Sequence, residues 1–292
     1  MLRFSIPSRV AVLALASLAL TTTIPAPTVA RDVAKEQSTE QPWDKEGVKL
    51  GRASLTRHLY PSSWLDKQAA DQYVALTRKA SQQRALLADD HPQVRRLRRI
   101  LNELLPAAPK WNAKAKDWKW EVNLIDSPGT LNAFCMPGGK IAFFTGILDK
   151  LQLTDDEVAM IMGHEIAHAL REHARERAAK QAITNIGAIG VAVITGSQAA
   201  GQMASMGGDL LGRRFSRGDE IEGDLIGMEL AARAGYDPRS GISLWKKMAA
   251  AANGAPPQWL STHPSNESRI QTIEANLKDV IPLYERAKAR RG

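Results

Sequence analysis

The stretch that decides the fold is Met162–His173, which reads MGHEIAHALREH. His164 and His168 are four residues apart, so on a helix they lie about 40° apart around the axis, one turn above the other. Two imidazoles so placed reach the same metal ion, and Glu165 projects beside them. In this HExxH pattern, zinc lowers the pKa of a bound water to about 7 and the carboxylate takes its proton. The stretch therefore predicts one zinc ion per chain.

The residues before the motif predict that it lies inside a helix. Thr154–Glu157, TDDE, is a capping-box signature, in which a threonine oxygen and a glutamate three residues later satisfy free amides. We expect this helix to continue through about Ala179. The alternative is a solvated helix that carries histidines by chance, and a third ligand elsewhere in the chain would exclude it.

His173 is the nearest candidate for a third ligand, but its position on the helix argues against it. It follows His168 by five residues, which places it about 140° further round the helix. We therefore expect His173 to be a polar or capping residue.

A better candidate lies downstream in Phe215–Met228, FSRGDEIEGDLIGM. Glu220 and Asp224 are four residues apart and share one face of a predicted helix. Glu220 can supply the third ligand, and Asp224 can accept a hydrogen bond from a ligating histidine. Spacing alone leaves Asp219 and Glu222 as competing carboxylates.

Four motifs occur in a fixed order: NAFCMPGGKIAFFTGIL at 132–148, HEIAH at 164–168, SRGDEIEGD at 216–224 and THPSNESRI at 262–270. Together they resemble the gluzincin metalloproteases of the CAAX prenyl protease and HtpX type, and especially the soluble periplasmic branch that contains LoiP and BepA. One departure is Gly223, where the family usually has alanine before the aspartate. Glycine weakens the helix slightly but removes no ligand.

The resemblance implies a role for each matching residue. His164, His168 and Glu220 would bind Zn²⁺, Glu165 would be the catalytic base, and Asp224 would support a ligating histidine. It also implies a zincin-type metalloprotease domain with a small β-sheet packed beside the HEXXH helix. The many helical patterns beside few strands agree with a mostly helical α+β fold.

His263 lies in a loop stiffened by Pro256, Pro257 and Pro264, just before a helix expected from Ser265. One interpretation is a histidine that caps this helix or is exposed on the loop. The resemblance instead places the loop over the metal site. There, His263 either donates a hydrogen bond to the developing oxyanion or fills the open zinc position and holds the enzyme latent. We favour the latent gate.

Alternating patterns predict strands at 118–125, WKWEVNLI, and at 140–145, KIAFFT. We expect the second to be an edge strand that binds extended substrate by strand addition, which needs no particular side chains. The alternative is an interior strand of the core. The substrate-binding residues would be Lys140, Ile141, Ala142, Phe143, Phe144 and Thr145.

Residues 1–30 have the pattern of a secretory signal peptide. Arg3 and Arg9 precede the apolar run VAVLALASLAL at 10–20, which is too short to span a bilayer comfortably. The alternative is an uncleaved anchor helix. Beyond it we expect a linker or docking segment at 31–66.

We expect the zinc metalloprotease domain to occupy residues 67–292. Within it, residues 182–208 carry no charge, and polar side chains interrupt the apolar run, so we expect a buried or mobile helical hairpin rather than a membrane span. The net charge of +8 comes without a nucleic-acid recognition motif, which argues against nucleic acid as a partner. Cys135 is the single cysteine, so no intramolecular disulfide can form, and we expect a small buried side chain.

From the resemblance, we expect a zinc endopeptidase that serves protein quality control in the bacterial periplasm. It would hydrolyse peptide bonds in unfolded or misassembled proteins, with peripheral association to the membrane or to envelope assembly proteins. The alternative is a chaperone-like binding module for unfolded envelope proteins, with latent or weak proteolysis.

Overall fold

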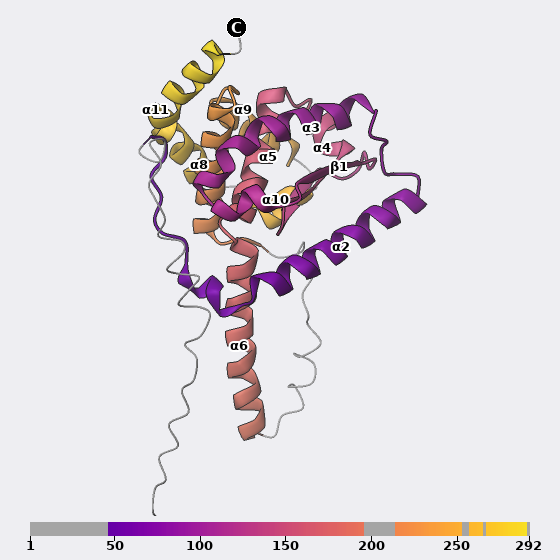
Figure 1. The fold of residues 1–292 in the computed structure, drawn as a ribbon, viewed down its shortest axis with the longest axis vertical. Coiled ribbons are helices and arrows are strands. Elements are labelled where there is room, and N and C mark those ends of the chain that lie inside the picture. The colour runs from indigo at the N-terminus through magenta and orange to yellow at the C-terminus, as the bar shows by residue number, and fades with distance from the viewer. Residues whose placement is uncertain (1–45, 196–213, 253–256, 265–266, 291–292) are drawn as a thin grey trace, which may run out of the picture. The chain divides into compact units, whose positions relative to one another are not determined.

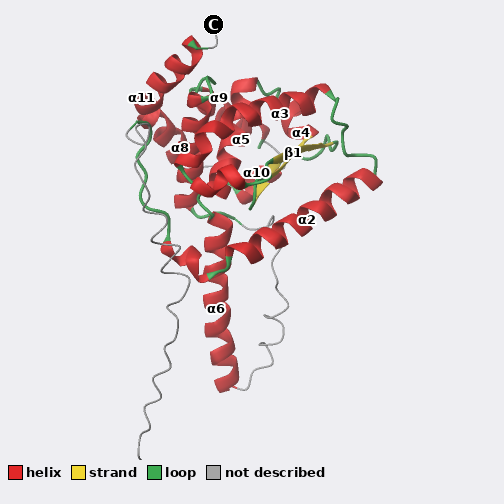
Figure 2. Cartoon of the chain, viewed as in Figure 1, coloured by secondary structure: helices red, strands yellow, loops and turns green. Residues whose placement is uncertain are grey.

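The computed structural model describes residues 46–195, 214–252, 257–264 and 267–290. The expected signal peptide, part of the expected linker and residues 196–208 of the expected hairpin lie outside the described residues. The described chain is mostly helical with one small sheet, which confirms the expected α+β class (Figure 2). No helix among these residues combines the length and apolar character that a membrane crossing needs.

Helices precede and follow the strands along the chain. In chain order, the elements are η2 (Leu55–Leu59), α2 (Ser62–Gln82), α3 (Pro92–Leu104), η3 (Leu105–Lys110), η4 (Ala113–Asp117), β1 (Glu121–Ile125), β2 (Ala133–Met136), β3 (Lys140–Phe144), α4 (Thr145–Lys150), α5 (Asp155–Leu170), α6 (His173–Thr195), α8 (Arg217–Arg233), α9 (Ser240–Ala251), α10 (Gln258–Thr262) and α11 (Glu267–Ala289).

The sheet has the strand order β1-β3-β2. β1 runs parallel to β3, with Glu121 opposite Lys140, and β2 runs antiparallel to β3, with Ala133 opposite Phe143. β3 is therefore the central strand, and its backbone is paired on both sides.

The prediction of an edge strand at 140–145 is wrong, because an incoming peptide finds no free backbone on β3. Thr145 lies outside the strand and begins α4. The two edge strands are β1 and β2, and β2 was not predicted from the sequence. Its four residues, AFCM, are too few to show the alternation that identifies a strand.

Helices cover both faces of the sheet (Figure 1). On one face α2 packs along the strands, and the cluster comprises Ala69, Tyr73, Ala80, Ile125, Met136 and Ala142. The side chains on the other face join the main core with α3 and α5, and include Val122, Leu124, Ile141 and Phe143. One face of the sheet thus packs against α5, and the edge strand β2 lies beside the HEXXH motif on that helix.

The single long helix expected through Ala179 is in fact two helices. α5 begins at the capping box, where the Thr154 hydroxyl accepts from the Glu157 amide and the Glu157 carboxylate accepts from the Thr154 amide. Glu172 has a φ of +55°, a left-handed conformation that an α-helix does not contain. The chain therefore changes direction there, and α6 starts at His173.

The backbones of α5 and α8 come into contact at glycines. A Cβ on Gly163 would lie 2.8 Å from the Gly227 carbonyl oxygen, and a Cβ on Gly227 would lie 2.6 Å from the His164 backbone nitrogen. A Cβ on Gly223 would lie 2.7 Å from the His164 ring. Glycine at 223 thus makes room for the His164 ring. The close contact between α5 and α8 sets the distance between the HEXXH motif and Glu220.

We expect Gly227→Ala to lower the free energy of unfolding by about 1–3 kcal/mol, as overpacking does in dense interiors. Urea denaturation would measure the change. Gly218→Ala is the matched control, because it lies in the first turn of the same helix with only Ser216 Oγ nearby, at 3.7 Å. The control should keep or raise stability. Equal stability of the two variants would refute the close crossing.

Candidate metal centre

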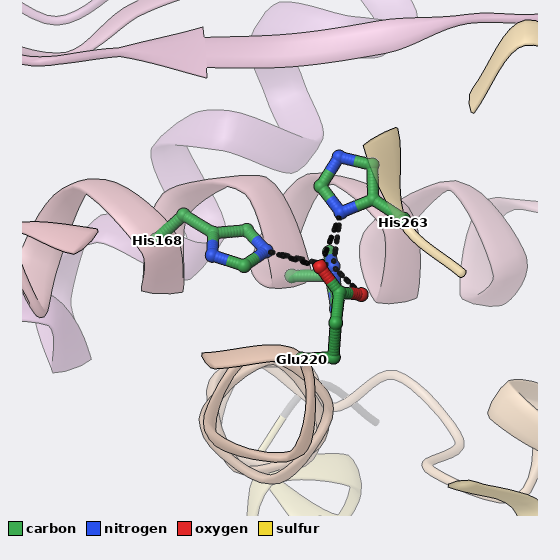
Figure 3. A group of neighbouring side chains, drawn as sticks. His168, Glu220 and His263 are labelled. Carbon is green, nitrogen blue, oxygen red and sulfur yellow. Dashed lines mark hydrogen bonds and ion pairs between the residues drawn. The ribbon is translucent and has the colours of Figure 1, made fainter. Parts of the chain in front are cut away.

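Side chains from three helices meet at one point within the described chain (Figure 3). His164 and His168 come from α5, Glu220 comes from α8, and His263 caps the C-terminus of α10. All four are buried, and one ligand atom from each lies within 4.8 Å of the others. His164 Nε2 is 3.0 Å from His168 Nε2 and 3.1 Å from His263 Nδ1, which is 3.0 Å from Glu220 Oε1.

These donors fit a zinc ion. Burial, reinforced by the neighbouring histidines, lowers the pKa of His168 well below its usual value, so this ring is neutral and able to bind metal. Burial would raise the pKa of Glu220, but a hydrogen bond from His263 and nearby positive charges outweigh it and lower that pKa. Imidazole nitrogens with an ionised carboxylate make a common zinc-binding set.

Arg269 holds two buried carboxylates in place, the candidate ligand Glu220 and the supporting Asp224. Its Nε and Nη2 each donate to Asp224 at 2.6 Å, and its Nη1 lies 2.5 Å from Glu220 Oε2. Asp224 Oδ1 is 3.1 Å from His164 Nδ1, where it can fix the tautomer of that ring. Burial alone would raise the pKa of Asp224, but Arg269 and His164 lower it. Arg269 was not predicted as a site residue, although it lies in the 262–270 motif.

His173 packs behind His168 rather than acting as a helix cap. The two Nδ1 atoms lie 2.8 Å apart, and His173 Nε2 lies 3.1 Å from Glu222 Oε2. Arg171 donates two hydrogen bonds to Glu222, at 2.5 and 2.9 Å. Glu222 therefore faces this supporting network, whereas Glu220 is the carboxylate in the metal-binding cluster.

Glu165 is buried at the wall of a cleft that lies beside the cluster. Its Oε1 accepts a hydrogen bond from Trp259 Nε1 at 2.7 Å and lies 3.4 Å from His263 Nε2. The cleft has a volume of roughly 760 Å³ including its open mouth. Residues 132–138, which include β2, line it, and 140–145 do not.

Cys135 also differs from expectation. It is only half-buried on β2, where it packs against the main core and also lines the cleft. Burial raises the pKa of its thiol well above the usual value, and the Glu165 charge acts in the same direction. The thiol is therefore protonated and adds an uncharged surface to the cleft.

Aromatic rings enclose His263 on both sides. The Phe215 ring stacks on His168, with centroids 3.8 Å apart, and on His263, with centroids 5.2 Å apart. Trp259 stacks on His263 at 4.8 Å. The Arg177 guanidinium lies 3.9 Å from the centroid of Phe215. These contacts hold the His263 ring against His168 and the other candidate ligands.

The HEXXH helix, the carboxylate from a second helix and the small sheet together define a zincin-type metalloprotease domain. The chain belongs to peptidase family M48, whose model matches residues 91–277.

Relatives in this family are named as metalloendopeptidases. The mitochondrial metalloendopeptidase OMA1 of Arabidopsis thaliana is 36% identical over 174 residues, which cover 59% of this chain and 35% of that protein. OMA1 of Saccharomyces cerevisiae is 29% identical, with 74% and 64% covered. The β-barrel assembly-enhancing protease of Escherichia coli is 29% identical, with 52% and 34% covered. The chain thus spans about one third to two thirds of the length of these relatives.

The comparisons correct the expected location. OMA1 proteins from plants, fungi and vertebrates match at 29–36% identity, and their names place them in mitochondria. They contradict the expected bacterial periplasmic location. The expected membership of the metalloprotease family is confirmed, whereas its narrower periplasmic branch is not.

We expect Glu220→Gln to lose zinc, because it removes an anionic ligand from the cluster. Glu222→Gln should retain the metal, since Glu222 contacts Arg171 and His173 and its amide can still accept hydrogen bonds. Elemental analysis of dialysed protein would give zinc per chain for both variants. An empty site in Glu222→Gln with a full site in Glu220→Gln would reverse the assignment.

Proposed function

We propose that this chain is a zinc-dependent endopeptidase that hydrolyses peptide bonds in unfolded or misassembled proteins. The observation that carries the proposal is Glu165 placed beside the convergent donors of His164, His168 and Glu220, on the wall of an open cleft. The endopeptidase names of the family relatives support it. A mitochondrial location, taken from the OMA1 names, replaces the periplasm in this proposal.

In this mechanism His164, His168 and Glu220 would hold the metal, and Glu165 moves protons. Zinc, when bound, supplies a water of lowered pKa and a Lewis acid for the carbonyl oxygen. Glu165 accepts the proton of the attacking water and returns it to the departing amine. Asp224 orients the His164 ring through its contact with Nδ1.

The free edge of β2 is our proposed substrate-binding strand. Among the described residues β2 pairs only with β3, and its residues line the cleft that contains Glu165. An extended peptide can add to such an edge through main-chain hydrogen bonds, with little demand on its side chains. This mode suits unfolded protein segments of varied sequence.

His263 is, in this proposal, a gate rather than an oxyanion donor. Its Nδ1 faces His164 and Glu220, so the imidazole can fill the position that a catalytic zinc leaves open. The Phe215 and Trp259 rings retain it there. Cleavage then requires His263 to leave, which would keep the resting enzyme latent.

Peripheral membrane association also remains a proposal. Leu55, Leu59 and Trp64 are each more than 60% exposed and lie on η2 and at the start of α2. Exposed apolar side chains grouped in this way are typical of contact surfaces. The suggestion of an assembly partner comes from the names of the Escherichia coli and Yersinia pestis relatives.

We expect Glu165→Gln to keep its zinc and its fold while peptide hydrolysis falls by about 10²–10⁴-fold, the usual contribution of a general base. Degradation of casein by the zinc-loaded protein would measure the rate, with zinc content and circular dichroism as controls. Turnover close to that of the unmodified protein would exclude Glu165 as the base. Capture of casein without cleavage by the unmodified, zinc-loaded protein would favour the chaperone-like alternative.

We expect His263→Ala to raise basal casein cleavage, because the open zinc position becomes accessible to water and substrate. Zinc should be retained through His164, His168 and Glu220. A fall in cleavage at full zinc content would instead assign His263 to oxyanion stabilisation. Unchanged cleavage would contradict both roles.

A further inference from the structure

Trp259 contacts the proposed catalytic base directly. Its indole Nε1–H donates to Glu165 Oε1 over 2.7 Å, and the two residues are 1% and 2% exposed. A buried hydrogen bond from a neutral donor to a carboxylate is stronger than one between neutral groups. The contact joins α5 to α10 across 94 residues of sequence.

The indole is itself held rigidly. The Trp259 backbone N–H donates to the Leu131 carbonyl at 3.0 Å, and its ring packs against Trp245 with centroids 5.3 Å apart. The His263 backbone N–H donates to the Trp259 carbonyl at 2.9 Å. Because Leu131 lies just before β2, the same tryptophan links the base to the edge of the sheet.

A carboxylate that moves protons must present one oxygen in a fixed direction, and errors of about 1 Å can cost roughly a hundredfold in rate. Oε1 of Glu165 accepts from the indole and also lies 3.4 Å from His263 Nε2, so Oε2 is the oxygen left for proton transfer. We propose that Trp259 is a positioning residue that anchors Oε1 of Glu165 and so presents Oε2 to the attacking water. This inference rests on the peptidase function proposed above.

The decisive variant is Trp259→Phe, which removes the N–H and keeps an aromatic ring between Trp245 and His263. We expect kcat for a fluorogenic peptide to fall about 10- to 100-fold, as for loss of a hydrogen bond to a charged group. KM and zinc content should stay unchanged. Trp120→Phe is the matched control, since it deletes an indole bond to the Ala115 carbonyl, at 2.8 Å, and Trp120 belongs neither to the cleft lining nor to the cluster.

An NMR readout tests the same bond without turnover. In ¹⁵N-labelled protein the indole N–H signal of Trp259 is identified by its absence from Trp259→Phe. We expect Glu165→Gln to move this signal upfield, because the acceptor loses its charge, and to leave the Trp120 signal in place. The measurement applies equally if Trp259→Phe does not fold, because assignment can then come from Trp120→Phe and the other tryptophan variants by elimination.

The inference would be overturned by an unchanged kcat in Trp259→Phe, by an equal loss in Trp120→Phe, or by an indole signal that does not move in Glu165→Gln. A loss of zinc that accounts for the whole fall in kcat would show a structural role and would also overturn it. An inactive unmodified protein would refute the proposed function instead, and the NMR experiment would still report whether the indole binds Glu165.

Discussion

The metal centre depends on the contact between the backbones of α5 and α8, where Gly163 meets Gly227. His164 follows the first glycine directly, and Glu220 lies about two helical turns before the second, so main-chain contact sets the separation of these two candidate ligands. Densely packed interiors have low compressibility, and a contact without intervening side chains leaves little room for adjustment. The donors are therefore placed before a metal binds, which reduces the cost of organising them.

Close placement brings together charges that need compensation. Glu220 and Asp224 are buried carboxylates, and an unpaired buried charge is strongly destabilising. Arg269, 1% exposed, contacts both of them and also lies over the Trp245 ring at 4.0 Å. It keeps the two carboxylates ionised, as a ligand and its hydrogen-bonding support must be. Arg269, from α11, thus stabilises the fold and also keeps the two carboxylates of the site charged.

Features that depend on residues close together in the sequence could be predicted, whereas features that depend on contacts between distant segments could not. HExxH spacing, the capping box at Thr154 and the shared face of Glu220 and Asp224 are local patterns, so the metal helix and its candidate ligands could be found. The central place of β3 could not, because strand order depends on pairings between distant segments. Arg269 and Trp259 were missed for the same reason, since their partners are 45 and 94 residues away.

Two side chains at the short helix α10, Trp259 and His263, have contrasting roles at the metal centre in our proposals. Trp259 is fixed by Leu131, by Trp245 and by the Glu165 carboxylate, whereas His263 lies at the end of the helix, where the regular backbone stops. Rotation of the His263 side chain would withdraw the imidazole while the bonds of Trp259 to Leu131 and Glu165 stay in place. The proposed gate can therefore open while the proposed base keeps its orientation, and a latent site need not be rebuilt each time that it becomes active.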